Sequence, residues 1–207
     1  MARFRREHDM LQACDIEFSY GKTPILEGVN IAVAPGERVA LSAPSGRGKT
    51  TLCKILSGYD EPQKGTVTVD GAPLPRKGVS PVQMIWQHPE RMLDPLMTME
   101  KSLAECPCDA ATLAALREEI GVRDEWLTRR PRELSGGELQ RFCIVRALAC
   151  SPRYLICDEI STMLDALTQA DLWKRLLRWA DETGAGLVTV THSPMLRDRI
   201  ATRVVEL

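Results

Sequence analysis

The most constraining feature of this sequence is an apolar stretch that runs directly into a glycine-containing loop and then into a helical pattern. The apolar stretch is RVALS, the loop is APSGRGKT from Ala43 to Thr50, and the helical pattern from Lys49 ends at Gly58. A strand, such a loop and a helix in this order are the context that a phosphate-binding loop requires. Apolar β-prone stretches alternate with helical ones along the rest of the chain, so we expect an α/β fold.

Each part of the loop has a chemical role if the loop binds a nucleotide. Backbone N–H groups from Gly46 to Thr50 would cradle the α- and β-phosphates, Lys49 would reach the β- and γ-phosphates, and the Thr50 hydroxyl would hold Mg²⁺. The candidate nucleotide-binding residues of the loop are Ser45, Gly46, Arg47, Gly48, Lys49, Thr50 and Thr51. Ala43 stands where the pattern G-x-x-x-x-G-K-[ST] has its first glycine, and alanine costs about 1 kcal/mol if this position needs a positive φ. A simple glycine-containing turn before a helix is the competing interpretation.

A second stretch with unpaired backbone donors occurs later in the chain. Ser135, Gly136 and Gly137, within LSGGE, stand just before the helical pattern ELQRFCIVRALAC. The first N–H groups of a helix have no partner inside it, and the helix dipole favours an anion there. A chain that already has one phosphate site needs another only if the nucleotide is shared. This stretch therefore indicates a partner molecule.

An apolar run from Tyr154 ends in two acidic residues, Asp158 and Glu159. A buried strand delivers such side chains to its carboxyl end, where α/β sheets bind ligands. Asp158 suits the Mg²⁺ shell, through water, and Glu159 suits the general base that orients and deprotonates an attacking water. An acidic pair after a strand is often only the start of a loop, so its weight comes from the lysine loop upstream.

The remaining pattern predicts one domain over residues 1–207, with a helical insertion between about residues 90 and 150. Strands are expected at 11–20 and within 25–43, joined by turns at Gly21, Gly28 and Pro35-Gly36, and a strand pair is expected at 66–71 and 82–86. Helical segments are expected at 98–121, after LSGGE, and at 168–182. Further strands are expected at 154–159, 186–193 and 202–207.

Charge and hydropathy limit the possible partners. The formal net charge of −1, from 27 basic and 28 acidic residues, gives no electrostatic case for nucleic acid or an anionic membrane. No stretch approaches the roughly 18 apolar residues that span a bilayer, so membrane association would go through another protein. The first ten residues lack the apolar segment of a secretory signal, which predicts a cytoplasmic chain, and the cluster Arg3, Arg5 and Arg6 is expected to be a solvated tail.

With these motifs in this order, the chain resembles the nucleotide-binding subunit of an ATP-binding cassette (ABC) transporter. The resemblance implies the P-loop fold of ABC type: a RecA-like core, an antiparallel β subdomain and a helical insertion. It also implies that Tyr20 stacks on adenine, that Gln87 senses Mg²⁺ and the γ-phosphate beside the permease groove, and that His192 contacts the γ-phosphate. Leu164-Asp165 matches the loop that crosses the dimer interface. Taken singly, each of these residues also fits a purely structural role.

A finer resemblance covers the segment after Gln87. Leu93-Asp94-Pro95-Leu96-Met97-Thr98-Met99 is similar to the L-[ND]-P-R-M-T-V segment of ATPases that drive dipeptide, oligopeptide, opine and nickel importers. Leu96 replaces the usual arginine, and Ile160 stands where most cassettes have proline. The resemblance implies an importer of peptides, nickel or a related small solute. The chain ends at Leu207, without the extension usual in the family, so regulation through a C-terminal domain is not expected.

The implied activity is ATP hydrolysis coupled to transport. ATP with Mg²⁺ would sit on Lys49, Thr50 and Tyr20 of one cassette and be capped by Ser135, Gly136 and Gly137 of a second cassette, either identical or a paralogue. Permease subunits would hold the pair at the inner face of the membrane. Two alternatives stay open: a soluble ABC protein that acts on ribosomes or DNA, and a weakly active regulatory cassette in which Ala43 impairs the site.

Overall fold

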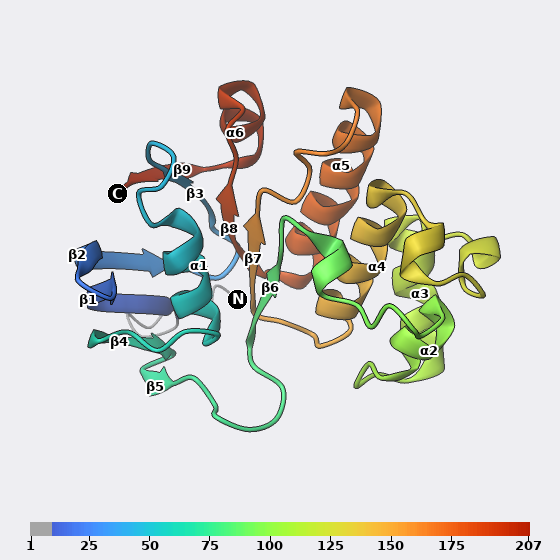
Figure 1. Cartoon of the computed structure of the whole chain (residues 1–207), viewed down its shortest axis with the longest axis horizontal. Helices are drawn as coiled ribbons and strands as arrows, with labels where there is room; N and C mark the ends of the chain where they lie inside the picture. The colour runs from blue at the N-terminus through green and yellow to red at the C-terminus, as the bar shows by residue number, and fades with distance from the viewer. Residues whose placement is uncertain (1–9) are drawn as a thin grey trace, which may run out of the picture.

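A five-stranded parallel sheet runs through the middle of the computed structural model, which describes residues 10–207 (Figure 1). Its strand order is β6-β7-β8-β3-β9. The strands are β3 (Arg38–Ser42), β6 (Val82–Ile85), β7 (Tyr154–Asp158), β8 (Gly186–Val190) and β9 (Arg203–Glu206). Every neighbouring pair in this sheet is parallel, so the carboxyl ends of all strands lie at one edge. That edge is where α/β sheets bind ligands.

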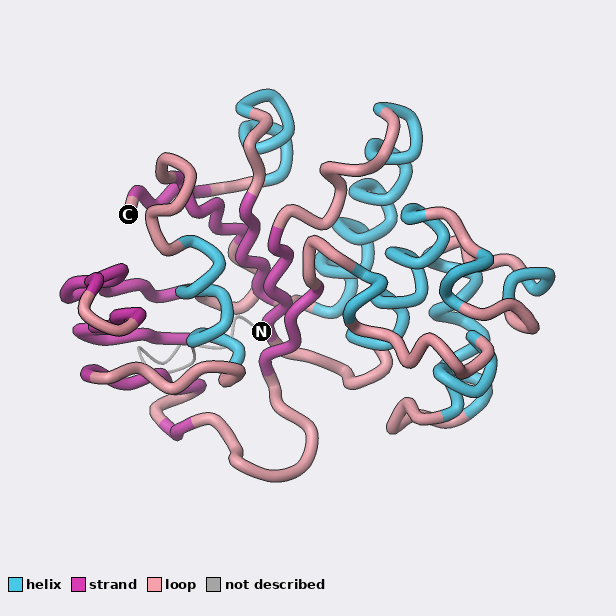
Figure 2. The backbone as a smooth tube through the Cα atoms, viewed as in Figure 1, coloured by secondary structure: helices cyan, strands magenta, loops and turns pink. Residues whose placement is uncertain are grey.

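A second, antiparallel sheet lies to one side, with the order β2-β1-β4-β5. Its strands are β1 (Leu11–Tyr20), β2 (Thr23–Val33), β4 (Lys64–Val69) and β5 (Ala72–Pro73). Figure 2 shows that most of the cyan helices lie on the side of the parallel sheet that faces away from the antiparallel sheet. The antiparallel sheet presents its apolar face to the parallel one, and one helix fills the space between them.

That helix is α1 (Lys49–Ser57), which begins after Gly48 and ends at Gly58, as the sequence predicts. Both glycines have a left-handed backbone, with φ values of 83° and 79°, which favours glycine at both ends. Its apolar side chains, such as Leu52 and Ile55, are fully buried in a core that joins the two sheets. The helix is therefore fixed from both sides, and its first turn is held at the carboxyl edge of β3.

Helices cover the opposite face of the parallel sheet (Figure 1). They are α2 (Met99–Ala104), α3 (Ala110–Ile120), α4 (Gly136–Leu148) and α5 (Ala166–Thr183), with the short 3-10 turns η1 (Pro89–Arg91), η2 (Asp124–Trp126) and η3 (Pro131–Glu133). Because both faces of the sheet are covered, β7 is buried along its whole length. Leu155 and Cys157 join the core beneath α4 and α5, whereas Tyr154 and Ile156 join the core around α1.

Three expectations about local structure are wrong. Gly28 does not separate two strands: it lies inside β2 with φ of 66°, where the β1–β2 register shifts, so its left-handed backbone makes an irregularity in one continuous strand. The strands at 64–69 and 82–85 are not partners, because β4 belongs to the antiparallel sheet and β6 to the parallel one. A short helix, α6 (Pro194–Ile200), follows β8 where no helix was expected.

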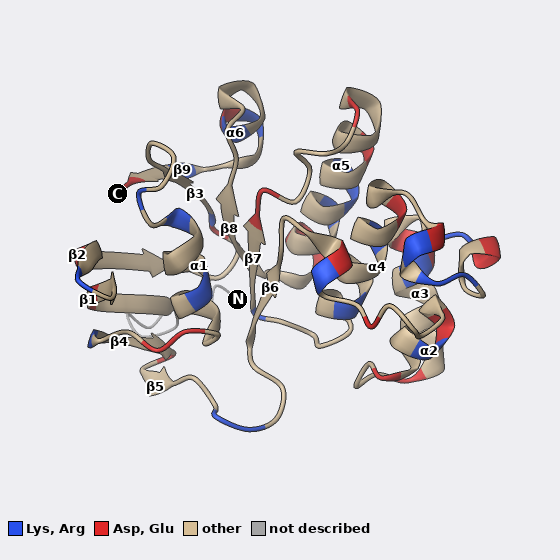
Figure 3. Cartoon of the chain, in the orientation of Figure 1, with Lys and Arg blue, Asp and Glu red and all other residues tan. Residues whose placement is uncertain are grey.

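Residues 10–207 include no helix with the length and apolar character needed to cross a membrane. Figure 3 shows both basic (blue) and acidic (red) positions on the helices that cover the parallel sheet. Arg3, Arg5 and Arg6 lie outside the described residues.

Candidate active site

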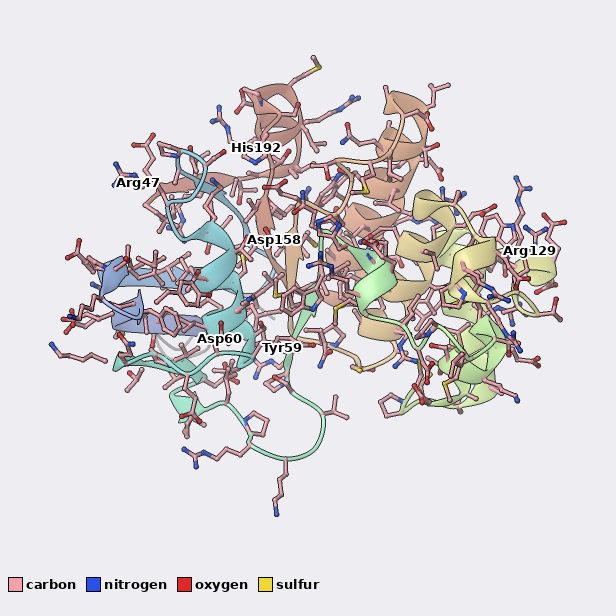
Figure 4. All side chains as sticks on the ribbon, in the orientation of Figure 1. Arg47, Tyr59, Asp60, Arg129, Asp158 and His192 are labelled. Atoms are coloured by element: carbon pink, nitrogen blue, oxygen red, sulfur yellow. The ribbon has the colours of Figure 1, made fainter. Side chains whose placement is uncertain are left out.

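A cavity of about 330 Å³ opens at the carboxyl edge of the parallel sheet. Its walls come from the end of β1, from the loop before α1, and from the ends of β7 and β8. The lining residues are Tyr20, Ile25, Ser45, Gly46, Gly48, Lys49, Thr50, Thr51, Glu159 and His192. Figure 4 shows Arg47, Asp158 and His192 toward this edge. The fold thus brings the phosphate loop together with residues more than a hundred positions later in the chain.

The loop before α1 is wrapped around the Lys49 side chain. The Lys49 ammonium, on a residue only 7% exposed, donates hydrogen bonds to the carbonyl oxygens of Ala43 at 2.7 Å and Pro44 at 3.0 Å. Gly46 and Gly48 have positive φ values of 77° and 83°, and a Cβ atom on Gly48 would lie 2.8 Å from Leu26 Cδ2. The loop conformation therefore requires glycine at position 48 and holds a buried positive charge at its centre.

Ala43 fits this loop without backbone strain. The residues of positive φ include Gly46 and Gly48 but not Ala43. Alanine was expected to weaken the site only if position 43 needs a positive φ, and position 43 does not have one. The departure from the usual glycine leaves the loop intact.

Glu159 connects the two other candidate catalytic residues. Its carboxylate accepts a hydrogen bond from Gln87 Nε2 at 2.9 Å, and its other oxygen lies 2.7 Å from His192 Nε2. The Glu159 side chain is 13% exposed, and its backbone has φ of 52°, a strained conformation for a residue other than glycine. The carboxylate that follows β7 is thus contacted by one side chain that follows β6 and one that follows β8. Such a fixed carboxylate can orient a water molecule and accept its proton.

Asp158 is the most deeply buried acid at this edge, at 3% exposed. Its Oδ1 atom has no hydrogen-bond partner among the described residues. Burial raises the pKa of Asp158, while a hydrogen bond from the Thr50 hydroxyl and the charge of Lys49 act in the opposite direction. A buried carboxylate oxygen without a partner beside a threonine hydroxyl fits the oxygen chemistry of a bound Mg²⁺.

Residues 10–207 contain no group of three His, Cys, Asp or Glu side chains placed to hold a metal ion. A cation at Asp158 would therefore need phosphate oxygens and water to complete its shell. This is how Mg²⁺ usually binds in nucleotide sites, through one or two protein ligands and the substrate phosphates.

Tyr20 lies at the rim of the cavity and is 51% exposed. Phe18 contacts its ring edge to face, with centroids 5.1 Å apart and planes at 80°, so Tyr20 is braced by an aromatic neighbour. Ile25 lines the same wall from β2, and no motif of the sequence singles it out. An exposed aromatic ring beside an aliphatic side chain can accept a flat aromatic group.

The second glycine-containing stretch does not line this cavity. Ser135 caps α4, where its hydroxyl accepts the Glu138 N–H while the Glu138 carboxylate accepts the Ser135 N–H. Gly136 and Gly137 occupy the first turn of the helix. The structure therefore separates residues 135–137 from the phosphate loop of the same chain.

Asp165 also has a structural role within its own chain. Its carboxylate caps α5, where it accepts the N–H groups of Leu167 and Thr168, each at 3.0 Å, and the Thr168 hydroxyl at 2.6 Å. Asp165 is not part of the cavity wall. Its neighbour Leu164 would be 2.9 Å from a Cβ atom placed on Gly137, so this loop packs closely on the start of α4.

One residue that supports the site could not be found from the sequence. Ser161, two positions after Glu159, is 4% exposed, and its hydroxyl accepts hydrogen bonds from Gln169 Nε2 at 2.8 Å and Trp173 Nε1 at 3.0 Å. These bonds attach the loop after β7 to α5. The sequence pattern shows no partner for Ser161, because both donors depend on how α5 packs.

The fold and this edge of the sheet together define a P-loop nucleotide-binding cassette, and comparison with known proteins identifies its family. The family model described as ABC transporter matches residues 26–162. The nickel import ATP-binding protein NikE of Rhodospirillum rubrum is 33% identical over 206 residues, covering 90% of this chain and 74% of NikE. The metal-staphylopine import system ATP-binding protein CntF of Staphylococcus aureus is 31% identical over 202 residues, covering 88% of this chain and 81% of CntF.

Solved structures have the same fold. An ATP-binding subunit of an ABC transporter superposes with a TM-score of 0.83 at 27% identity, covering 96% of this chain and 85% of that one. A dimeric ATP-binding cassette in a post-hydrolysis state, bound to ADP and Pi, has a TM-score of 0.82 at 24% identity and covers 96% and 94%. The chain belongs to the ABC transporter family. It is an ATP-binding and ATP-hydrolysing subunit of such a transporter.

Proposed function

We propose that the cavity at the carboxyl edge of the parallel sheet is the ATP site and that Glu159 is its catalytic base. The convergence of Gln87 and His192 on the Glu159 carboxylate, beside a loop with a buried lysine, carries this proposal. Phosphoryl transfer leaves little covalent chemistry to the protein, so positioning and electrostatic stabilisation supply most of the catalysis. Glu159 would orient the attacking water, and Gln87 and His192 would fix the direction of its carboxylate.

The nucleotide would be held along the cavity wall. Tyr20 would stack on the adenine ring, and the backbone donors and side chains of Ser45, Gly46, Arg47, Gly48, Lys49, Thr50 and Thr51 would surround the phosphates. Lys49 would exchange its bonds to the Ala43 and Pro44 carbonyls for phosphate oxygens. Thr50, Asp158 and Gln87 are the residues that would hold Mg²⁺, which supplies positive charge where the phosphates develop negative charge.

A second cassette would complete each site. Ser135, Gly136 and Gly137 present a helix N-terminus that lies outside the cavity of their own chain, and a helix N-terminus favours a phosphate. We assign these residues to the ATP held by a partner cassette, with Asp165 and its loop at the interface. Whether the partner is a second copy or a paralogue does not change this geometry. Residues 1–207 would act as one ABC unit.

The alternative, a weakly active regulatory cassette, is no longer supported by Ala43. It rested on strain at Ala43, and Ala43 has no positive φ. The expected role in transport gains support from the relatives, which are ATP-binding proteins of nickel and metal-staphylopine import systems. We therefore infer that this chain powers the import of nickel, a chelated metal or a related small solute. Permease subunits would hold it at the cytoplasmic face of the membrane.

The catalytic assignment is tested by Glu159→Gln and Lys49→Ala. Glu159→Gln keeps the shape of the side chain but removes the base, so ATP binding by calorimetry is expected to persist while phosphate production falls at least about a hundredfold. Lys49→Ala removes the buried charge from the loop and is expected to abolish measurable ATP binding. Normal turnover in Glu159→Gln, or unchanged affinity in Lys49→Ala, would contradict these roles.

The transport assignment is tested by purifying the chain from the membranes of its source cells and identifying the proteins bound to it, followed by uptake of radioactive nickel in those cells. The permeases are expected to copurify with the chain, and uptake is expected to stop with Glu159→Gln. Uptake of a labelled peptide, with no uptake of nickel, would assign the system to the peptide importers instead.

A further inference from the structure

A second cavity, of about 150 Å³, lies directly behind the phosphate loop. It is enclosed by the end of β3, the start of the loop, the end of β8 and helix α6, which stands beside the loop in Figure 1. The lining residues are Leu41, Ser42, Ala43, Lys49, Thr191, His192, Pro194 and Arg197. Lys49 and His192 also line the nucleotide cavity. These two side chains thus stand between the two cavities.

The groups around this second cavity are mostly hydrogen-bond donors. Lys49 brings an ammonium group with three donors, of which two are directed to the Ala43 and Pro44 carbonyls. The Thr191 hydroxyl accepts the Ser193 N–H at 3.2 Å, so its own proton stays available to donate. Ser42 adds a second hydroxyl. Arg197 brings a guanidinium from α6. Two cations and two hydroxyls around one small space match an oxyanion with several acceptor oxygens.

The nearby carboxylates are already engaged. Asp198 holds Arg197 through contacts of 2.8 Å to Nε and Nη2, and its side chain is 64% exposed, so this pair is largely solvated. The other terminal nitrogen of Arg197 has no acceptor among residues 10–207. Glu159 is turned to Gln87 and His192. An anion in the second cavity would therefore meet donors more than competing acceptors.

The geometry points to a binding site for inorganic phosphate, the product of ATP hydrolysis, in this second cavity. This inference rests on the proposed ATP site. The γ-phosphate position would lie beside Lys49 and His192, and both residues also face the second cavity, so the product could move past them and remain bound between Lys49 and Arg197. The cavity exceeds several-fold the roughly 30 Å³ that one water occupies, which leaves room for a tetrahedral anion. Arg197 is the charged residue that lines this cavity and does not line the nucleotide cavity.

Equilibrium dialysis of ³²P-labelled inorganic phosphate against the full chain with ADP bound tests the site. Arg197→Gln removes a charge-assisted donor, so the Kd for phosphate is expected to rise about tenfold or more. Arg197→Lys keeps the charge and is expected to retain most of the affinity. Arg199→Gln is the matched control, because Arg199 is exposed on the same helix and does not line the cavity. ATP affinity, measured on the same samples, is expected to change much less than phosphate affinity.

Three outcomes would overturn the site: equal phosphate affinity in Arg197→Gln and the unsubstituted chain, an equal loss in Arg199→Gln, or a parallel loss of ATP affinity. Failure of the unsubstituted chain to bind ATP would instead contradict the proposed function.

A second experiment asks whether the site holds the phosphate produced by hydrolysis as well as phosphate taken up from solution. The assembled transporter hydrolyses ATP in a single turnover, in which acid quench measures the cleavage of ATP and a fluorescent phosphate sensor measures the release of phosphate. Release should lag behind cleavage, and Arg197→Gln should shorten the lag. Release without a lag in the unsubstituted complex would overturn the product assignment.

Discussion

At the scale of single residues, the candidate site depends on backbone conformations that the sequence shows only in part. Gly48 has φ of 83° and no room for a Cβ atom, whereas Glu159 adopts φ of 52° despite its side chain. Glycine at position 48 adopts its left-handed backbone without strain, whereas glutamate at position 159 is strained by its own. Strain of this kind, on the order of 1–3 kcal/mol, persists where the surroundings enforce it, and here Gln87 and His192 hold the carboxylate.

Ala43 gives the first prediction. Because its φ is not positive, Ala43→Gly is expected to leave ATP affinity within about twofold and to lower the free energy of unfolding by about 0.5–1 kcal/mol, through the greater freedom of the unfolded chain. ATP calorimetry and urea unfolding measure the two effects. Gly48→Ala is the matched comparison in the same loop, and there we expect loss of ATP binding and a destabilisation above about 1 kcal/mol. A large gain of affinity in Ala43→Gly would show that alanine does impair the loop.

At the scale of elements, the sequence predicted what depends on local pattern and missed what depends on packing. The helix from Lys49 and the buried strand from Tyr154 were predicted because glycine positions and continuous apolar runs fix them locally. Helix α6 was missed because only Ile200 of its seven residues is buried, which leaves almost no periodic signal. The contact between Gln87 and Glu159 joins positions 72 apart, and only the order β6-β7-β8 brings them together.

The two glycines that open α4 provide a matched pair. A Cβ atom on Gly136 would meet nothing within 4 Å, whereas one on Gly137 would lie 2.9 Å from Leu164 Cδ2. Gly136→Ala is therefore expected to raise the free energy of unfolding by up to about 1 kcal/mol, since alanine favours helix. Gly137→Ala is expected to gain less, because Leu164 must move. Urea unfolding compares them, and an equal or larger gain for Gly137→Ala would rule out a close contact between Leu164 and α4.

The cap of α5 predicts a pH effect. Hydrogen bonds from the Thr168 hydroxyl and backbone N–H lower the pKa of Asp165. A carboxyl whose pKa is lower in the folded state stabilises the protein above its unfolded pKa of about 4, and this stabilisation is lost as the pH falls through the folded pKa. Asp165→Ala should therefore lower the Tm at pH 7, with a difference that shrinks below about pH 4.

Asp198→Ala is the control for this experiment, because Asp198 is an exposed acid that caps no helix start. Thermal unfolding followed by circular dichroism between pH 3 and pH 7 is the measurement. A Tm difference for Asp165→Ala that stayed constant over this range would mean that the charge of Asp165 does not contribute to the cap.

At the scale of the whole molecule, the two stretches proposed to bind phosphate lie in different parts of one chain. The phosphate loop is held between the two sheets, whereas residues 135–137 open a helix on the other side of the parallel sheet. The cavity that contains Lys49 includes none of residues 135–137. In the proposed arrangement, one chain would supply one half of each of two different sites, and a closed pair related by twofold symmetry would supply two complete sites.

This separation can be tested by mixing two inactive chains. Lys49→Ala removes the loop function but keeps residues 135–137, and Gly136→Asp does the reverse, because its acid would repel phosphate while the open space around Gly136 leaves folding intact. Each variant alone is expected to be inactive. If two copies of this chain form the pair, half of the dimers in an equal mixture are mixed and each contains one complete site, so about a quarter of the normal ATPase rate should return. Activity in Gly136→Asp alone would show that each chain completes its own site, and a mixture as inactive as its components would show that copies of this chain do not share sites.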